Sequence, residues 1–246
     1  MDATPNDGDW SAGAPKVKIA NNAVGVLYAE DQAGFLAGYA AVMDGYKVFG
    51  FMGGMAVPAV VRFGYGFIQG VEYAADRLGL PAGSTSVNYY YTGDFKATPD
   101  VQNRAAAWYR DGIEVIFACG GAVGNSVMAA AEQAGKKVIG VDVDQSGESP
   151  TVITSAMKGL SASVKACISD YYFGEFPGGQ ELVFEAKNEG VGLPMSTSKF
   201  ENFSDTDYQN IYFELQTGNI PRMDNLEEQG SPKVVPVRIT RVNEVK

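Results

Sequence analysis

Four times between Lys47 and Phe173 the chain repeats a short apolar strand, a turn of glycine or polar residues, and a helix. The repeats are spaced roughly 25 to 40 residues apart, as expected for the strand–helix–strand units of a parallel sheet. The strands expected from this pattern are 47–52, 86–91, 114–119, 138–141 and 151–155. Their near-continuous apolar runs are typical of strands that helices cover on both faces. The pattern predicts an α/β protein with a doubly wound parallel sheet.

Helices are expected between and beside these strands, and Pro58 and Pro99 suit the first turns of two of them. The expected helices are 30–43, 58–78, 99–109, 125–134, 158–173 and 205–216. Either Asn125 or Ser126 would cap the fourth helix. Further strands are expected at 23–28 and 180–186, with an edge strand at 234–239 that Pro236 interrupts. Residues 1–15 are rich in Asp, Gly, Pro and Asn, and this composition predicts a loop.

Composition excludes several classes of function. The net charge of −10 argues against binding to nucleic acid or to an anionic membrane surface. The absence of histidine removes Ser-His-Asp and Cys-His catalysis and His-ligated zinc. Cys119 and Cys167 fall in apolar patterns and are interpreted as buried free thiols. No stretch is apolar and long enough to span a bilayer, and residues 1–30 show no signal segment.

The turns after the strands indicate where a ligand would bind. In a parallel sheet all strand carboxyl ends point the same way, so GGMAV, TGDFKA, GGAVGN and DVDQSG are expected to line one edge. None of them matches a dinucleotide or triphosphate motif. The similar-looking Gly64, Gly66 and Gly70 fall inside a predicted helix, so we interpret them as close helix–sheet packing. The candidate ligand-binding residues are Phe95, Gly120, Gly121, Asp142, Asp144 and Lys158.

These residue types suit a neutral, flat, hydroxylated molecule such as a nucleoside or a sugar. The Phe95 ring offers a stacking face, the Asp142 carboxylate offers two acceptors to a vicinal diol, and the glycine turn offers backbone N–H donors. Each has a structural alternative: Asp142 could only cap its turn, Phe95 could fold back into the core, and Lys158 could be a solvated helix residue. No cofactor and no metal are expected.

Several stretches closely resemble the basic membrane protein family, the nucleoside-binding lipoproteins that serve ABC transporters. They are EDQAGFLAGYAA, KVFGFMGG, FGYGFIQGVEYAA, EVIFACGGAVGNSVMAAAEQAGKKVIGVDVDQ and VITSAMKGL, and the resemblance runs from about Asp2 to past Phe213. It implies the type I periplasmic-binding-protein fold, in which two α/β lobes close over a purine nucleoside. It also implies base stacking by Phe95, backbone contacts from Gly121, a ribose contact from Asp142 and a ligand contact from Lys158.

The sequence departs from this family at its N-terminus. Family members begin with a signal peptide, a lipid-modified cysteine and several βα units. Residues 1–44 are therefore interpreted as a remnant of the N-terminal lobe, 45–157 as the C-terminal ligand-binding lobe, and 158–246 as a return segment shared between lobes. A lobe reduced to residues 1–44 and the C-terminal return should expose apolar surface, and the chain alone should bind ligand weakly, if at all.

The resemblance implies a non-enzymatic solute-binding component of an importer, which would dock on an ABC transporter permease. It would lie on the extracytoplasmic face of the cell membrane, attached only through an N-terminal lipid anchor that this sequence does not show. An alternative is a nucleoside- or sugar-processing α/β enzyme that uses Asp142 or Asp144 as a base. A ligand-sensing domain of a regulator would share the same fold.

Overall fold

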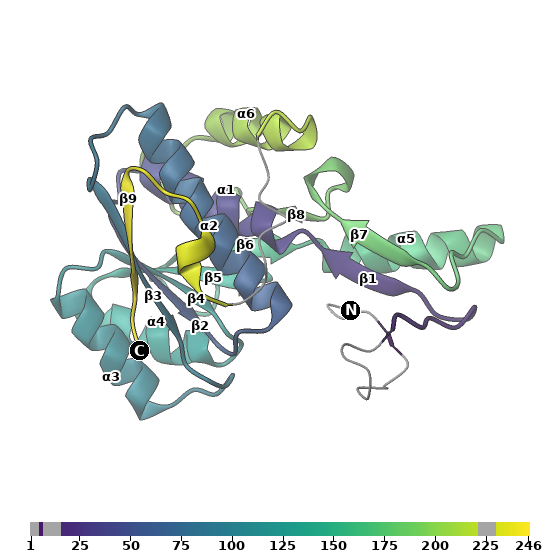
Figure 1. The fold of residues 1–246 in the computed structure, drawn as a ribbon, viewed down its shortest axis with the longest axis horizontal. Coiled ribbons are helices and arrows are strands. Elements are labelled where there is room, and N and C mark those ends of the chain that lie inside the picture. The colour runs from purple at the N-terminus through teal and green to yellow at the C-terminus, as the bar shows by residue number, and fades with distance from the viewer. Residues whose placement is uncertain (1–4, 7–15, 221–229) are drawn as a thin grey trace.

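The computed structural model describes residues 5–6, 16–220 and 230–246, so most of the predicted loop at 1–15 lies outside the described residues. It contains a seven-stranded sheet in the order β8-β6-β5-β4-β2-β3-β9, in which β8 alone is antiparallel to its neighbour (Figure 1). Its strands are β2 Val48–Gly53, β3 Thr85–Tyr91, β4 Val115–Cys119, β5 Lys137–Asp142, β6 Val152–Lys158, β8 Val191–Gly192 and β9 Thr240–Glu244. The prediction of an α/β fold with a largely parallel sheet is confirmed.

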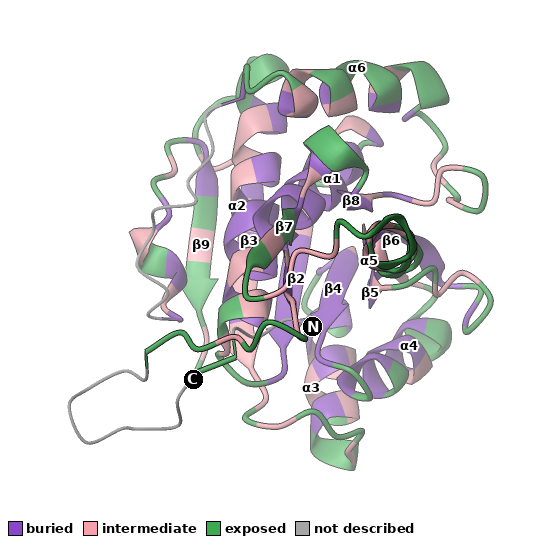
Figure 2. Ribbon diagram, turned by 90° about the vertical axis from the view of Figure 1, so that its right-hand side faces the viewer, coloured by how far each residue is buried: buried purple, intermediate pink, exposed green. Residues whose placement is uncertain are grey.

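A second, two-stranded parallel sheet pairs β1 (Gly25–Tyr28) with β7 (Glu181–Phe184). The helices are α1 Glu30–Met43, α2 Pro58–Arg77, α3 Pro99–Arg110, α4 Val123–Ala134, α5 Leu160–Phe173 and α6 Asp205–Gln216, with 3-10 turns η1 Ala186–Asn188 and η2 Pro232–Val234. Helices α3 and α4 cover one face of the large sheet, α1 and α2 cover the other, and α6 lies outside α1. The inner strands β2, β4, β5 and β6 are largely buried between them, whereas the edge strand β9 is mostly exposed (Figure 2).

Glycines bring α1 and α2 into direct backbone contact. A Cβ at Gly66 or Gly70 of α2 would overlap the backbone of α1, and a Cβ at Gly34 of α1 would overlap the carbonyl of Phe63. Only Gly64 supports the predicted helix–sheet packing, because a Cβ there would strike Tyr89 in β3. The packing prediction is therefore wrong for Gly66 and Gly70, whose small size serves helix–helix contact instead.

Three predicted boundaries are also wrong. Lys158 is the last residue of β6 and not the first residue of a helix, because the next helix, α5, begins at Leu160. Helix α4 begins at Val123, and Ser126 accepts a hydrogen bond from the Thr98 N–H instead of capping its own helix. The C-terminal edge strand is 240–244 and not 234–239.

The position of β9 follows from a carboxylate on α2. Glu72 accepts backbone hydrogen bonds from the N–H groups of Arg238, Ile239 and Thr240 at 2.7, 2.9 and 2.8 Å. Burial acts to raise the pKa of Glu72, but these hydrogen bonds to the ionised form outweigh it and lower the pKa below its ordinary value. The chain is thereby fixed to α2 where β9 begins beside β3.

The substitution Glu72→Gln should lower the free energy of unfolding by about 2 kcal/mol, because a charge-assisted acceptor of three N–H groups is lost. The wild-type advantage should be complete above the ordinary Glu pKa of 4.5 and should disappear as the pH falls through the lowered folded-state pKa. Urea unfolding of both proteins at pH 7 and at pH 3 measures this. An equal difference at the two pH values would contradict it.

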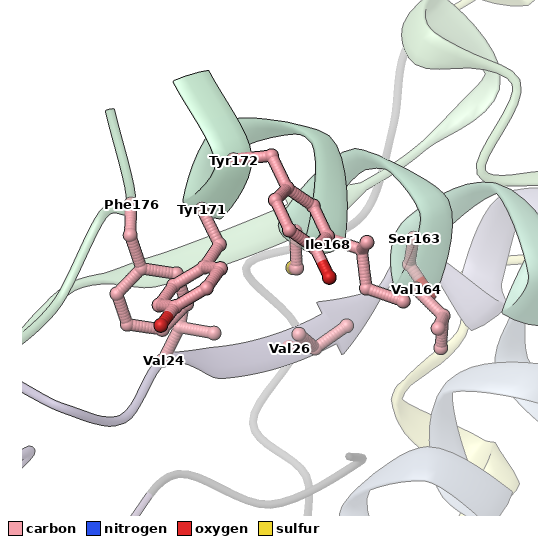
Figure 3. A pocket seen from close by; sticks show the side chains of 9 residues that line it. Val24, Val26, Ser163, Val164, Ile168, Tyr171, Tyr172 and Phe176 are labelled. Atoms are coloured by element: carbon pink, nitrogen blue, oxygen red, sulfur yellow. The ribbon is translucent and has the colours of Figure 1, made fainter. Parts of the chain in front are cut away.

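The expectation of exposed apolar surface is confirmed on α5. Ile168, Tyr172 and Phe173 are 52%, 82% and 78% exposed, and Val183 on β7 is half exposed. A groove of about 540 Å³ runs between α5 and β1, lined by valine, isoleucine and aromatic side chains (Figure 3). Cys167 also lines it and is a partly exposed free thiol, contrary to the prediction of burial. Parallel strands usually have both faces covered, so this surface is unusual for a folded chain.

The double substitution of Ile168 and Tyr172 by Glu should reduce the binding of a hydrophobic fluorescent dye to the folded protein, because these side chains supply much of the exposed apolar area. Phe213→Glu on α6 is a matched control, since Phe213 is 62% exposed but lies outside the groove. Dye fluorescence that falls equally in both variants would show that the groove is not a distinct surface.

Candidate functional site

A cavity of about 210 Å³ lies at the carboxyl ends of β4, β5 and β6, beside the start of α2. Five of the six predicted site residues line it: Phe95, Gly120, Gly121, Asp142 and Lys158. The remaining wall is Val57, Pro58, Ala59, Val60, Phe63, Cys119 and Val141. The α5 groove is larger, but its lining is almost wholly apolar. The smaller cavity is therefore the better candidate, because it combines an aromatic face, backbone and charges.

Asp142 ends β5 in a left-handed backbone conformation, with φ of +66°. Its buried Oδ1 atom lies 3.2 Å from the ammonium of Lys158, whereas the side chain as a whole is 46% exposed. One side of the carboxylate is thus held by a charge and the rest is accessible. Asp142 therefore forms an ion pair and does not merely cap a turn. Because Oδ1 is engaged, its carboxylate offers a ligand fewer acceptor positions than two free oxygens would.

A glutamine three residues later holds the strand end in this shape. The Gln145 Oε1 atom accepts the Val141 N–H at 2.8 Å, and the Gln145 N–H donates to Ser155 Oγ at 3.0 Å. A Cβ at Gly140 would lie 2.6 Å from that same Oε1 and 2.7 Å from Ser155 Oγ, so a larger residue there would displace these hydrogen-bonding groups. The GVDVDQ motif therefore has a structural part, Gly140 and Gln145, that fixes the backbone carrying Asp142.

Lys158 is a buried ion-pairing residue and not a solvated helix residue. It is 5% exposed, and its Nζ atom lies 3.2 Å from Asp142 and 3.5 Å from Glu30. The ammonium also lies over the rings of Tyr28 and Phe63, at 5.7 and 5.3 Å from their centres. Two carboxylates and two aromatic faces compensate its burial.

Glu30, which begins α1, is a residue that the sequence did not single out for the site. It is fully buried, and its Oε2 accepts a hydrogen bond from Nε of Arg62 at 2.6 Å. Burial raises the pKa of Glu30, while Arg62 and Lys158 oppose that shift. In the sequence Glu30 is an ordinary acidic residue at a helix start, and no local spacing connects positions 30, 62 and 158.

Phe95 is partly exposed at the rim of the cavity, with 39% of its surface accessible. Its ring packs against the bare backbone of Gly54, where a Cβ would overlap it. It is therefore not a core residue. Gly121 has a φ of +55°, which favours glycine, and a Cβ at Gly120 would lie 2.7 Å from the nitrogen of Gly54. The turns that carry Gly54, Phe95 and Gly120 therefore approach one another closely, because their glycines lack side chains.

Asp144 lies outside the set of cavity residues. Its carboxylate accepts hydrogen bonds from the Ser146 N–H at 2.9 Å and from the Thr197 hydroxyl at 2.7 Å. Partial burial acts to raise the pKa of Asp144. The hydrogen bonds from Ser146 and Thr197 outweigh this effect, so the pKa of Asp144 is lowered. Asp144 thus tethers its loop to Thr197 and lies apart from the other five predicted site residues, and its contact with a ligand stays a prediction.

The cavity presents polar and aromatic groups together with one thiol. Burial, with a contribution from Asp142, holds the pKa of the free Cys119 thiol well above its usual range, so the thiol stays protonated. Among the described residues, no cluster of acidic or cysteine side chains is grouped to hold a metal ion. Over those same ranges, no helix is long and apolar enough to cross a membrane.

Comparison with solved structures supports the fold. An ABC transporter solute-binding protein from Aeropyrum pernix K1 superposes with a TM-score of 0.64 and 23% identity, over 90% of this chain and 60% of that one. A solute-binding protein from Conexibacter woesei DSM 14684 gives 0.66 and 23%, over 85% and 68%. A transcriptional activator of the comK gene from Bacillus halodurans gives 0.65 at 17% identity, over 82% and 68%. The fold is that of type I periplasmic binding proteins.

Sequence comparison identifies the family. Basic membrane protein D of Borreliella burgdorferi is 30% identical over 195 residues, which are 77% of this chain and 55% of the relative. The ABC transporter nucleoside-binding protein BmpA of Lactococcus lactis is 28% identical over 207 residues, covering 76% and 57%. This chain thus spans little more than half the length of these curated relatives. A family model described as ABC transporter substrate-binding protein PnrA-like matches residues 8–221, and the chain belongs to this family, the basic membrane proteins.

Proposed function

We propose that this chain is the ligand-binding part of an ABC importer's solute-binding protein and that its ligand is a purine nucleoside. The observation that carries the proposal is the convergence of Phe95, the Gly120–Gly121 turn, Asp142 and Lys158 on one cavity. The nucleoside-binding relative from Lactococcus lactis supports the choice of ligand class. The partners are then a nucleoside and a membrane permease, and the site faces the extracytoplasmic side.

Each wall of the cavity suits one part of a nucleoside. The exposed face of Phe95 can stack on the base, and stacking on an aromatic ring tolerates either purine. The accessible side of Asp142 can accept a hydrogen bond from a ribose hydroxyl, and charged acceptors give the stronger hydrogen bonds. Lys158 lies 3.2 Å from one oxygen of that carboxylate and so orients it. Backbone N–H groups of the glycine turn supply further donors without side-chain entropy.

Binding by this chain alone should be weak. The described cavity walls come from the edge of the large sheet and the start of α2, and they enclose about 210 Å³. A solute-binding protein of two lobes gains affinity and a transport signal when the second lobe closes over the ligand. In this proposal, residues 45–157 form the ligand-binding lobe. Residues 1–44 are a remnant of the other lobe, and residues 158–246 are shared between the two lobes.

An enzyme acting on the same molecule is less well supported. The lowered pKa of Asp144 makes it a weak base at neutral pH, and Oδ1 of Asp142 already faces an ammonium. Prolonged incubation with adenosine followed by chromatography distinguishes the two functions. Intact nucleoside is expected, and release of free base over hours would overturn the proposal.

The substitution Asp142→Asn should weaken adenosine binding by about 1.5–3 kcal/mol, because a charged acceptor for ribose becomes neutral while asparagine still tolerates the left-handed backbone. Isothermal titration calorimetry measures the change. Asp144→Asn is the matched control two residues away and should leave the affinity unchanged. Equal losses in the two variants would show that Asp142 has no special contact with the ligand.

The substitution Phe95→Leu should weaken binding of adenosine by about 1–3 kcal/mol, the usual contribution of base–aromatic stacking. Binding of free ribose should be unaffected, because ribose has no base to stack. Phe213→Leu on α6 is the control for loss of an exposed ring. If ribose binding falls as much as adenosine binding, Phe95 only supports the shape of the turn.

A further inference from the structure

The chain passes between its two sheets three times. It passes from β1 into the first turn of α1 at residues 29–32, leaves β6 for α5 at 158–160, and leaves β7 for β8 at 185–190 (Figure 1). These crossings lie beside one another, because residues from each contact residues from the others. Together they form one junction between the two sheets.

Each pair of crossings is joined by a contact. The Gln32 Oε1 atom accepts the N–H of Ala186 at 2.7 Å, which joins the first crossing to the third. The N–H of Gly159 donates to the carbonyl of Gly190 at 2.7 Å, which joins the second to the third. The first and second are joined by the ion pair of Glu30 with Lys158. Of these three contacts, the ion pair is the one that continues into the candidate ligand site.

Charges of alternating sign run from α2 through this junction to the cavity. Arg62 contacts Oε2 of Glu30, Oε1 of Glu30 lies 3.5 Å from Lys158, and Lys158 lies 3.2 Å from Asp142. Glu30 and Lys158 are 0% and 5% exposed, so solvent screens this pair little. The Lys158 ammonium therefore divides its interaction between a fully buried carboxylate and the carboxylate that lines the cavity.

We propose that Glu30 is a positioning residue of the ligand site, acting through Lys158. By sharing the ammonium, Glu30 keeps Lys158 at the floor of the cavity and leaves the accessible side of Asp142 free for a ribose hydroxyl. Without the Glu30 charge, the ammonium would shift toward Asp142, which it contacts on the side of the cavity. The Asp142 carboxylate would then interact more strongly with Lys158 and would be less available to a ligand. This inference rests on the proposed function.

The test compares Glu30→Gln with wild type for two ligands, adenosine and 2′,3′-dideoxyadenosine, by calorimetry of the full chain. The ratio of the two affinities reports the ribose hydroxyl contacts. Glu30→Gln should reduce that ratio by about tenfold, the effect of weakening one charged hydrogen bond. A merely structural role would weaken both ligands alike and leave the ratio unchanged, which would overturn the proposal. Glu72→Gln, a carboxylate of α2 outside the cavity, should also leave the ratio unchanged.

A second measurement needs no ligand. Lys158 should react faster with acetic anhydride at pH 8 in Glu30→Gln, because loss of a nearby carboxylate favours the neutral amine. Peptide mass spectrometry measures the rate, with Glu72→Gln as the control for general loosening. An unchanged rate at Lys158 would show that Glu30 does not hold it. If the wild type binds neither nucleoside, the proposed function is wrong, and so is the ligand part of this inference. The labelling rate still tests the contact between Glu30 and Lys158.

Discussion

The close approach of α1 to α2 determines much of the rest of the structure. Gly34 and Gly38 on α1 and Gly66 and Gly70 on α2 let the two backbones touch, and no larger residue would fit at these positions. Contacts between backbones leave little freedom to slide, unlike contacts between flexible side chains. The pair is therefore fixed in one register, and the start of α1 is held against the second turn of α2. Glu30 reaches both Arg62 and Lys158 for this reason.

This packing places a row of oppositely charged side chains beneath the cavity. In the order Arg62, Glu30, Lys158 and Asp142 the charges alternate in sign, so each of the two buried inner charges, Glu30 and Lys158, lies between charges of opposite sign. Removing either inner partner would leave an uncompensated buried charge, which usually costs more than the pair contributes. The cluster is thus better understood as a device for orientation than as a source of stability.

Much of the fold could be predicted from local pattern, because the apolar runs and the proline-led helices are properties of neighbouring residues. The errors fall where distant residues decide. Strand β9 begins at Thr240 because Glu72 on α2 binds the preceding N–H groups, and no feature near residue 234 reveals this. Asp142 and Asp144 look equivalent in sequence, yet Gln145 and Thr197 give them different surroundings. Glu30 was missed because its partners are 32 and 128 positions away.

The left-handed backbone at Asp142 also limits how the ligand preference of such a protein could change over time. Glycine, asparagine and aspartate adopt this conformation readily, whereas β-branched and bulky residues are strained in it. Most exchanges at this position would cost stability before they altered recognition. New specificity would arise more easily at the rim, where Phe95 and the first turn of α2 present side chains on ordinary backbone. In the proposed nucleoside site, the sugar contact would therefore be the conservative part and the base contact the adaptable part.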